Sequence, residues 1–246
     1  MKITGISIAL CLIFTVSPVL AINYYVATNG ADGAQVTGAI NDPFRTISYG
    51  VSRANQPGDT LSIRSGTYSP GSTINMIYDG QPGNPITLRG YPGESVIIDG
   101  GTMAADQNVI AVISHDIIIS DLEIQNATAT GIAFYGPGYW IYDNEVFNTV
   151  IHHCWLGAVY VGYNDLANPP HDVYIHDNIF YRNSQSNALP PHTAWAIASG
   201  SGNAYNVTLE NNEVYENFGE GIGFFISNRC HAIGNTVYDN FSVNIY

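Results

Sequence analysis

A phrase of alternating apolar and polar residues recurs along the second half of the chain. Its clearest copy spans residues 206–217, and four further copies keep its apolar and Asn positions in register, at residues 118–124, 140–147, 174–181 and 231–238. The aligned apolar positions are 22, 34, 34 and 23 residues apart, at Ile119, Ile141, Ile175, Leu209 and Ala232. A short period with longer excursions is typical of a repeat architecture.

Each copy alternates with period two, bends at an Asn and alternates again, which predicts strand, turn and strand. Asn tolerates the left-handed conformation of a sharp bend, and stacked Asn side chains can hydrogen-bond along a ladder, here at Asn144, Asn178, Asn212 and Asn235. A third short strand follows in most copies, at residues 131–134, 157–161, 194–198 and 221–225. Three strands in about 22 residues predict one coil of a parallel β-solenoid, with coils about 4.8 Å apart.

An antiparallel sandwich is the main alternative fold, because it also has many short strands at regular spacing. The phrase always recurs in one orientation with one internal register, and hairpin dipeptides are few. The pattern therefore favours an all-β parallel solenoid.

The N-terminus carries a charged start, an apolar run over residues 6–16 and a small-residue cleavage site ending at Ala21. This pattern predicts a secretory signal peptide over residues 1–21 and a mature β-helix domain over residues 22–246, secreted or periplasmic. No later apolar run approaches the length of a membrane span.

The charge balance narrows the choice of partners. The chain has seven Lys and Arg against 20 Asp and Glu, and removal of the signal takes Lys2, the one lysine. Nucleic acid is a poor partner for so acidic a surface, whereas calcium, neutral sugars or cation-rich partners are compatible. A polyanionic substrate would need a bridging metal or a local Arg patch. We expect Cys154 and Cys230 to lie too far apart for a disulfide.

Both ends of the solenoid lead to expectations. Asp42 can cap a helix with Pro43 in its first turn, and Phe44, Ile47, Val51 and Ala54 share one face, so a short helix should cover the first coil. The chain stops at Tyr246, in line with the third strand of the last coil. Because solenoids need terminal caps, we expect further C-terminal coils beyond this sequence.

Three segments in the first part of the domain are similar to a known family of proteins; they span residues 24–30, 41–47 and 56–68. With residues 85–93 and 96–100 they resemble the opening of secreted right-handed parallel β-helix proteins of the pectate-lyase-like type, including polysaccharide lyase family 9. The resemblance spans almost all of the mature chain. It implies a β-helix, while the same opening is shared by lyases, epimerases, hydrolases and proteins without activity.

Extra residues flank the third strand of the two long coils, at residues 149–155, 163–171 and 184–195. Such excursions should wall a groove across the third sheet. Aromatic side chains would line it and could either stack on sugar rings or pack the loops down. They are Trp155, Tyr160, Tyr163, Trp195 and Phe225.

Candidate catalytic groups lie near this groove. A histidine could remove the proton beside a uronate carboxyl group while Tyr160 returns one to the leaving oxygen, although solvated or structural histidines fit the pattern too. The histidines are His152, His153 and His192. Glu220 and Asp165 are also placed toward the groove. The resemblance to pectate-lyase-like enzymes further implies that an arginine could act as the base, either Arg182 or Arg229, although neither lies in a matching motif.

A column of acids, Asp121, Asp143 and Asp177, aligns just before the Asn bend. Stacked carboxylates repel one another unless a cation intervenes, so they either bind calcium, together with Asp165, or stabilise turns. The resemblance implies a lysine base beside an aspartate-bound calcium, and the mature chain lacks lysine, so that mechanism does not transfer. The third strands also lack the paired Asp of a hydrolase.

The leading hypothesis is a secreted carbohydrate-active protein, resembling polysaccharide lyases, that cleaves or binds an acidic polysaccharide. A glycan-binding or adhesion solenoid without catalysis is the alternative, and a purely structural solenoid is a third. The oligomeric state stays open.

Overall fold

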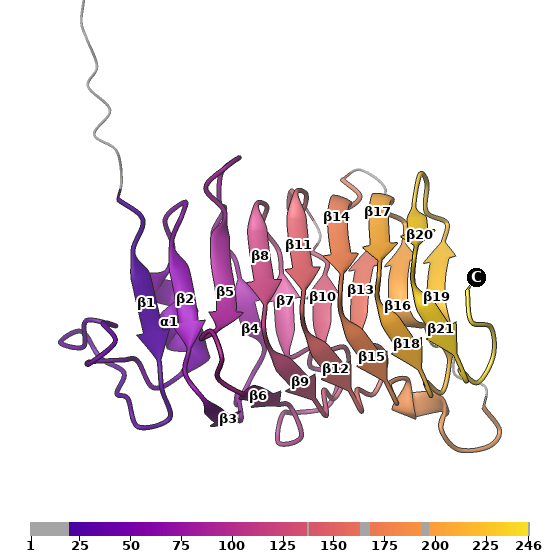
Figure 1. The fold of residues 1–246 in the computed structure, drawn as a ribbon, viewed down its shortest axis with the longest axis horizontal. Coiled ribbons are helices and arrows are strands. Elements are labelled where there is room, and N and C mark those ends of the chain that lie inside the picture. Colours follow the sequence, from indigo (N-terminus) through magenta and orange to yellow (C-terminus); the bar gives the residue numbers. More distant parts are fainter. Residues whose placement is uncertain (1–19, 137, 163–167, 193–196, 246) are drawn as a thin grey trace, which may run out of the picture.

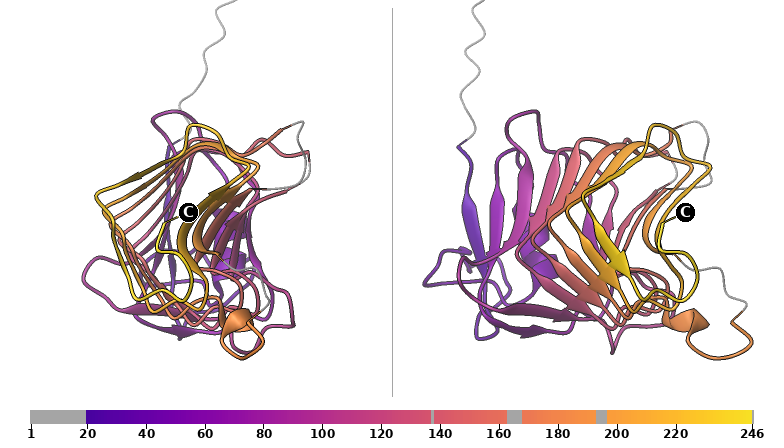
Figure 2. Two further views of the ribbon diagram at one scale, coloured as in Figure 1. Left: turned by 90° about the vertical axis from the view of Figure 1, so that its right-hand side faces the viewer. Right: turned by 45° about the vertical axis from the view of Figure 1, so that its right-hand side comes forward.

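The computed structural model describes residues 20–136, 138–162, 168–192 and 197–245. The chain winds into a solenoid whose successive coils each add one strand to three parallel sheets (Figure 1). Viewed along its axis, the molecule shows coils that superpose around a closed interior (Figure 2). The predicted parallel β-helix is confirmed. The predicted signal peptide falls outside the described residues, apart from Leu20 and Ala21.

The first sheet has eight strands, β1 (Asn23–Val26), β2 (Thr60–Ile63), β5 (Ile86–Gly90), β8 (Ile117–Ser120), β11 (Asn144–Phe147), β14 (His171–His176), β17 (Tyr205–Glu210) and β20 (His231–Ile233). The second has seven, β3 (Gly66–Tyr68), β6 (Val96–Asp99), β9 (Glu123–Gln125), β12 (Val150–His152), β15 (Ile179–Tyr181), β18 (Glu213–Tyr215) and β21 (Thr236–Tyr238). The third has six, β4 (Ile74–Met76), β7 (Ile110–Val112), β10 (Ile132–Phe134), β13 (Val159–Gly162), β16 (Ile197–Gly202) and β19 (Glu220–Phe225).

The register of one repeat copy differs from the prediction. Val146, not Ile141, pairs with Ile119 on one side and Ile175 on the other. The steps along this column are therefore 27, 29, 34 and 23 residues, with the same last three positions, Ile175, Leu209 and Ala232. Residues 140–147 match the phrase by local likeness, but the in-register copy lies five residues later.

Each coil turns its corners on residues with positive φ, which suit Asn and Asp because their short polar side chains tolerate this conformation. The corner before the first sheet uses Asp116, Asp143, Asp172, Asn206 and Arg229. The corner between the first and second sheets uses Asp121, Asn148, Asp177, Asn211 and Gly234. The acids Asp121 and Asp177 thus share one corner, while Asp143 belongs to another, so the predicted acid column is wrong.

Two buried Asn ladders tie the last coils together. In the predicted ladder, the Oδ1 atom of Asn212 accepts hydrogen bonds from the backbone N and Nδ2 of Asn178, and Asn235 does the same for Asn212. Thr149, not Asn144, extends this ladder, because its backbone N and hydroxyl donate to Asn178 Oδ1. A second ladder, beyond the second sheet, repeats the pattern with Asn183, Asn217 and Asn240.

The core consists of apolar columns that run along the axis. Leu61, Leu88, Ile119, Val146, Ile175 and Leu209 lie one above another in the first sheet, and all are buried. The N-terminal end is covered by α1 (Ile47–Arg53), whose buried side chains Ile47 and Val51 face the first coils. The predicted helix exists, but Thr46 caps it by accepting a hydrogen bond from Tyr49 N, so the assignment of Asp42 as cap is wrong.

Apolar side chains of the last coil, including Ile233, Phe241 and Ile245, are about half exposed. Cys154 is buried, Cys230 is partly buried, and both are free thiols. Within the described ranges, no helix has the length and apolar character needed to cross a membrane.

Candidate functional site

The outer face of the third sheet has a floor of small residues. One column of positions alternates with the core residues and therefore points outward. In register it contains Asn75, Ala111, Ala133, Tyr160, Gly200 and Gly223. Only Tyr160 carries a large side chain in this column, and Ala111, Ala133, Gly200 and Gly223 are buried.

Glycines in this floor are required by the backbone. Gly162 and Gly200 have φ values of 152° and 150°, which L residues rarely adopt. A Cβ on Gly200 would collide with the carbonyl oxygen of Gly223, and one on Gly162 would collide with that of Gly202. A Cβ on Gly202 would meet the Tyr160 hydroxyl. The phenol of Tyr160 therefore packs directly on the backbone of Gly202, which only a residue without a side chain allows.

Glu220 reaches the same floor from the start of β19. Its Oε2 atom lies 3.1 Å from the point that a Cβ on Gly223 would occupy. This oxygen is buried and has no hydrogen-bond partner among the described residues. Burial raises the pKa of the Glu220 carboxyl, and burial likewise raises the pKa of the Tyr160 phenol. The floor thus carries a carboxyl group that holds its proton more tightly than usual, and a phenol that stays protonated.

Three other predicted residues lie along the borders of this sheet. Trp155 precedes β13 on the side of the second sheet, and its side chain is 49% exposed. His192 lies on the same side, in the excursion that contains the short 3₁₀ helix η1 (Gln185–Asn187); its Nδ1 is 2.8 Å from the Asn187 carbonyl oxygen and its ring packs on Phe241. Phe225 ends β19 on the opposite border and is 39% exposed.

His152 and His153 do not line this face, which corrects the prediction. Residues 149–155 are no excursion: they contain β12, a regular strand of the second sheet. His152 Nε2 lies 3.1 Å from Glu123 Oε1, and its ring stacks on Tyr181 at the head of a ladder that continues through Tyr215 and Tyr238. His153 turns the next corner with positive φ, and burial together with His152 lowers its pKa.

The remaining predicted acids and the arginine are separated from one another. Asp143 and Asp177 occupy different corners of the coil, and Asp177 Oδ2 lies 2.7 Å from His176 Nδ1. Arg229 lies in the corner between β19 and β20, beside a hollow of about 270 Å³. Arg182 bonds to Glu216, away from the third sheet. The structure therefore places Tyr160 and Glu220 on the third-sheet face, with the border residues beside it, and places these other groups elsewhere.

Tyr163, Asp165 and Trp195 lie outside the described residues. Among the described residues, no three His, Cys, Asp or Glu side chains converge as a metal site would require. Asp143 and Asp177 in particular cannot share one calcium ion, because they belong to different corners.

The sequence interpretation missed a ladder of rings at the border between the third and first sheets. His115, Tyr142, His171 and Tyr205 stack in register, with ring centroids 4.4, 5.3 and 4.5 Å apart. The signal was present: a His or Tyr followed by Asp or Asn recurs at the start of the first-sheet strand or just before it, at residues 115, 142, 171 and 205.

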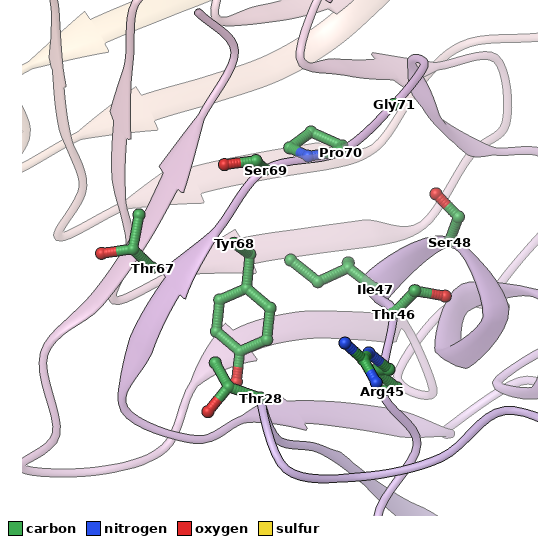
Figure 3. Close-up of a pocket in the computed structure, with 10 residues that line it drawn as sticks. All are labelled: Thr28, Arg45, Thr46, Ile47, Ser48, Thr67, Tyr68, Ser69, Pro70 and Gly71. Atoms are coloured by element: carbon green, nitrogen blue, oxygen red, sulfur yellow. The ribbon is translucent and has the colours of Figure 1, made fainter. Parts of the chain in front are cut away.

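A separate hollow of about 470 Å³ lies beside α1 and β3 (Figure 3). In this view the Tyr68 phenol points toward Thr28, with the guanidinium of Arg45 and the hydroxyls of Thr46, Ser48 and Ser69 around the hollow. Tyr68 also donates to the Arg64 carbonyl oxygen, and burial raises its pKa to about 12. The hollow could receive polar groups, but it lies at the opposite end of the axis from β19 (Figure 1).

Three parallel sheets around an apolar core, with small residues and a few polar groups on one outer face, define a β-helix protein of the pectate-lyase-like class. Residues 24–188 match the family model described as "Pel9A-like, right handed beta helix region". The chain therefore belongs to the Pel9A-like right-handed β-helix family.

Two curated relatives share part of this sequence. The chain is 37% identical to the uncharacterized protein YwoF of Bacillus subtilis (strain 168) over 123 residues, which is 46% of the chain and 25% of that protein. It is 34% identical to the pectate lyase PEL9 of Emericella nidulans over 131 residues, 53% of the chain and 29% of that protein. The matched segment thus spans less than a third of either relative.

Solved structures resemble it in fold. The crystal structure of pectate lyase Pel9A has a TM-score of 0.62 at 17% identity, and the match covers 93% of this chain and 73% of that one. A rhamnogalacturonan lyase has a TM-score of 0.58 at 16% identity, covering 91% and 60%. At these identities the likeness shows the fold alone.

Proposed function

We propose that this protein binds an acidic polysaccharide along the outer face of the third sheet and cleaves it by β-elimination. The observation that carries the proposal is the buried Glu220 Oε2 atom beside Gly223, which has no hydrogen-bond partner among the described residues and lies on the same face as Tyr160. The family membership and the named activity of the pectate lyase relative support this class of substrate.

The chemistry assigns a role to each group. In β-elimination a base takes the proton from the carbon beside the uronate carboxyl, a carbon–carbon double bond forms, and the bond to the leaving oxygen breaks. Ionised Glu220 would accept that proton, because burial makes its carboxylate a stronger base. The Tyr160 hydroxyl would donate a proton to the leaving oxygen, since burial keeps it protonated.

Binding would rely on aromatic rings as well. Trp155 and Phe225 would offer ring faces to sugar C–H groups at the borders of the sheet. Tyr163 and Trp195, which the sequence predicts for the same role, lie outside the described residues. Of the three histidines predicted to be catalytic, His192 is the one that lies at the border of this face. Its Nδ1 atom is 2.8 Å from the Asn187 carbonyl oxygen.

We also propose that calcium could bridge the carboxylates of an acidic substrate to those of this acidic protein. The described acids do not fit such an ion, so no step of the reaction is assigned to it. Asp165 is the predicted ligand outside the described residues.

The test follows ultraviolet absorbance of unsaturated products from polygalacturonate, rhamnogalacturonan and alginate, with and without calcium. We expect a rise on at least one substrate, reduced about a hundredfold by Glu220→Gln and by Tyr160→Phe. Glu216→Gln is the matched control, because that carboxylate pairs with Arg182 on another face and is exposed. An absence of product from every substrate, or full activity in Glu220→Gln, would refute the proposal.

Export also belongs to the proposal, on the evidence of the signal-like sequence over residues 1–21. Ile22, the first residue of the predicted mature chain, contacts the folded domain: its backbone N donates a hydrogen bond to Asp59 Oδ1 at 2.9 Å. N-terminal sequencing of protein from the medium or periplasm should begin near Ile22. Recovery of the uncleaved chain in the cytoplasm would contradict export.

A further inference from the structure

A groove of about 660 Å³ runs beside the border between the third and first sheets. Its walls come from the loop after β4, the turn after β7 and the loop after β10, so three successive coils contribute. The lining residues are Ile77, Asp79, Ile113, His115, Gly138, Tyr139, Trp140, Tyr142 and His171. None of these residues belongs to the face that carries Tyr160 and Glu220.

The floor of this groove is a fixed stack of rings. The His115 and Tyr142 rings are 4.4 Å apart and nearly parallel, and Tyr142 and His171 are 5.3 Å apart. Each imidazole is held by the next residue, His115 Nδ1 at 2.8 Å from Asp116 Oδ2 and His171 Nδ1 at 2.6 Å from Asp172 Oδ2. These rings therefore present their edges and polar atoms in a preset arrangement.

The wall adds ring surface that the stack does not use. Trp140 is 63% exposed and Tyr139 is 48% exposed, and no ring partner of Trp140 is found among the described residues. Their loop is anchored rather than free: Gly138 turns it with φ 76°, Tyr139 lies close to Gly136, and His171 N donates to the Ile141 carbonyl oxygen. Large apolar surface held at a groove is typical of a binding site.

The charge of the groove selects among ligands. Asp79 lines the groove with a side chain that is 57% exposed and an Oδ2 atom 3.6 Å from His115 Nε2, and Asp116, Asp143 and Asp172 follow one another along the adjoining corner. This row of carboxylates repels polyanions, whereas carboxylates and imidazoles are good partners for sugar hydroxyls. An exposed indole completes this chemistry by stacking on the C–H face of a sugar ring.

We propose that this groove is a second carbohydrate-binding site, which takes an uncharged oligosaccharide with Trp140 as its stacking platform and Asp79 and the His115–Tyr142–His171 edge as its hydroxyl partners. The site is independent of the third-sheet face. It would hold the protein on neutral glycans that accompany an acidic polysaccharide in a mixed matrix.

The experiment measures binding of the full chain to xylohexaose, cellohexaose and galactan oligosaccharides by calorimetry, with a lysine-rich peptide and polygalacturonate as comparison ligands. We expect saturable binding of at least one neutral oligosaccharide, weakened about tenfold or more by Trp140→Ala. Asp79→Asn should weaken it as well. Tyr238→Ala, which removes an exposed ring on the second sheet, should leave it unchanged.

Two comparisons separate this site from the proposed lyase face. Trp140→Ala should keep activity on polyuronates, and Glu220→Gln should keep neutral-glycan binding. The inference fails if no neutral oligosaccharide binds, if binding survives Trp140→Ala in a variant whose circular dichroism is native, or if the lysine-rich peptide binds in this groove instead.

Discussion

The pKa values of two glutamates, Glu94 and Glu220, are shifted in opposite directions by their surroundings. Glu94 accepts hydrogen bonds from the Arg64 guanidinium and from Ser65 N, and these bonds lower its pKa. Glu220 has an oxygen without such a partner in the described part of the chain, and burial raises its pKa. Glu94 stabilises the fold, whereas the surroundings of Glu220 are unfavourable for its charge and suit a reacting group.

The pH dependence of stability should therefore differ in sign between them. A carboxyl with a raised folded pKa loses stability as pH rises from its unfolded pKa toward the folded one, so Glu220→Gln should raise the melting temperature at pH 7. Below a pH of about 4 the difference should disappear, because both states are then protonated.

Glu94→Gln is the matched control for this measurement. Its folded pKa is lowered, so the stability that it contributes is present above the unfolded pKa and is lost as pH falls. This variant should melt lower than wild type at neutral pH, with the difference shrinking in acid. Thermal melts followed by circular dichroism check both, and a Glu220→Gln protein that melts lower at pH 7 would contradict the assigned environment.

The sequence located Tyr160 and Glu220 near the third sheet but misplaced His152 and His153. Tyr160 and Glu220 could be placed because they lie in strands with an unambiguous apolar alternation. The histidines were assigned to the wrong part of the coil because residues 140–147 look like the repeat phrase but are out of register. In the true register, Thr149 stands where the other copies have the Asn of the bend. A hydroxyl can make one of the ladder bonds, so the substitution is structurally acceptable and hides the register.

At the scale of the elements, we expect the Asn ladders to contribute more to the free energy of unfolding per side chain than other polar groups. Asn212 is buried, accepts two hydrogen bonds from Asn178 and donates to the Ile175 carbonyl oxygen and to Asn235. Asn212→Ala leaves these groups unpaired in the interior, and we expect a loss of about 3 kcal/mol in the free energy of unfolding.

Chemical denaturation measures this loss, with Asn84→Ala as control. Asn84 is exposed in a loop, so its replacement should change the free energy of unfolding by less than about 0.5 kcal/mol. Equal effects of the two variants would show that the ladder contributes little.

Element by element, the apolar alternation predicted strands of the later coils better than those of the first coils. β10, β13 and β19 overlap the segments expected at residues 131–134, 157–161 and 221–225, whereas no strand was expected at β3 or β4. Three residues such as Gly66–Tyr68 contain too little periodicity to distinguish a strand from a turn. The N-terminal helix was found by its apolar face, but its cap was assigned to Asp42, whose carboxylate instead bonds to Thr37.

The whole molecule is strongly acidic, with a formal charge of −13 at pH 7 for the full sequence. This field repels a polyuronate over distances longer than any single contact, and salt screens it within about 10 Å at 0.1 M. Binding of polygalacturonate should therefore strengthen as sodium chloride rises from about 10 to about 100 mM. Binding of an uncharged oligosaccharide should not change. Calorimetry at the two salt concentrations checks both, and polyuronate binding that weakens with salt would reveal an attractive basic patch instead.

From β8 onward, the inward residues of the first and second sheets are always five positions apart, as in Ile119 and Ile124, or Leu209 and Val214. The additions that distinguish one coil from another fall elsewhere, before and after the third sheet. Segments before and after the third sheet can therefore be lengthened, shortened or exchanged. The corner between the first and second sheets and the core keep their spacing when this happens. A protein built this way can change its specificity by insertion, without a compensating change in its interior.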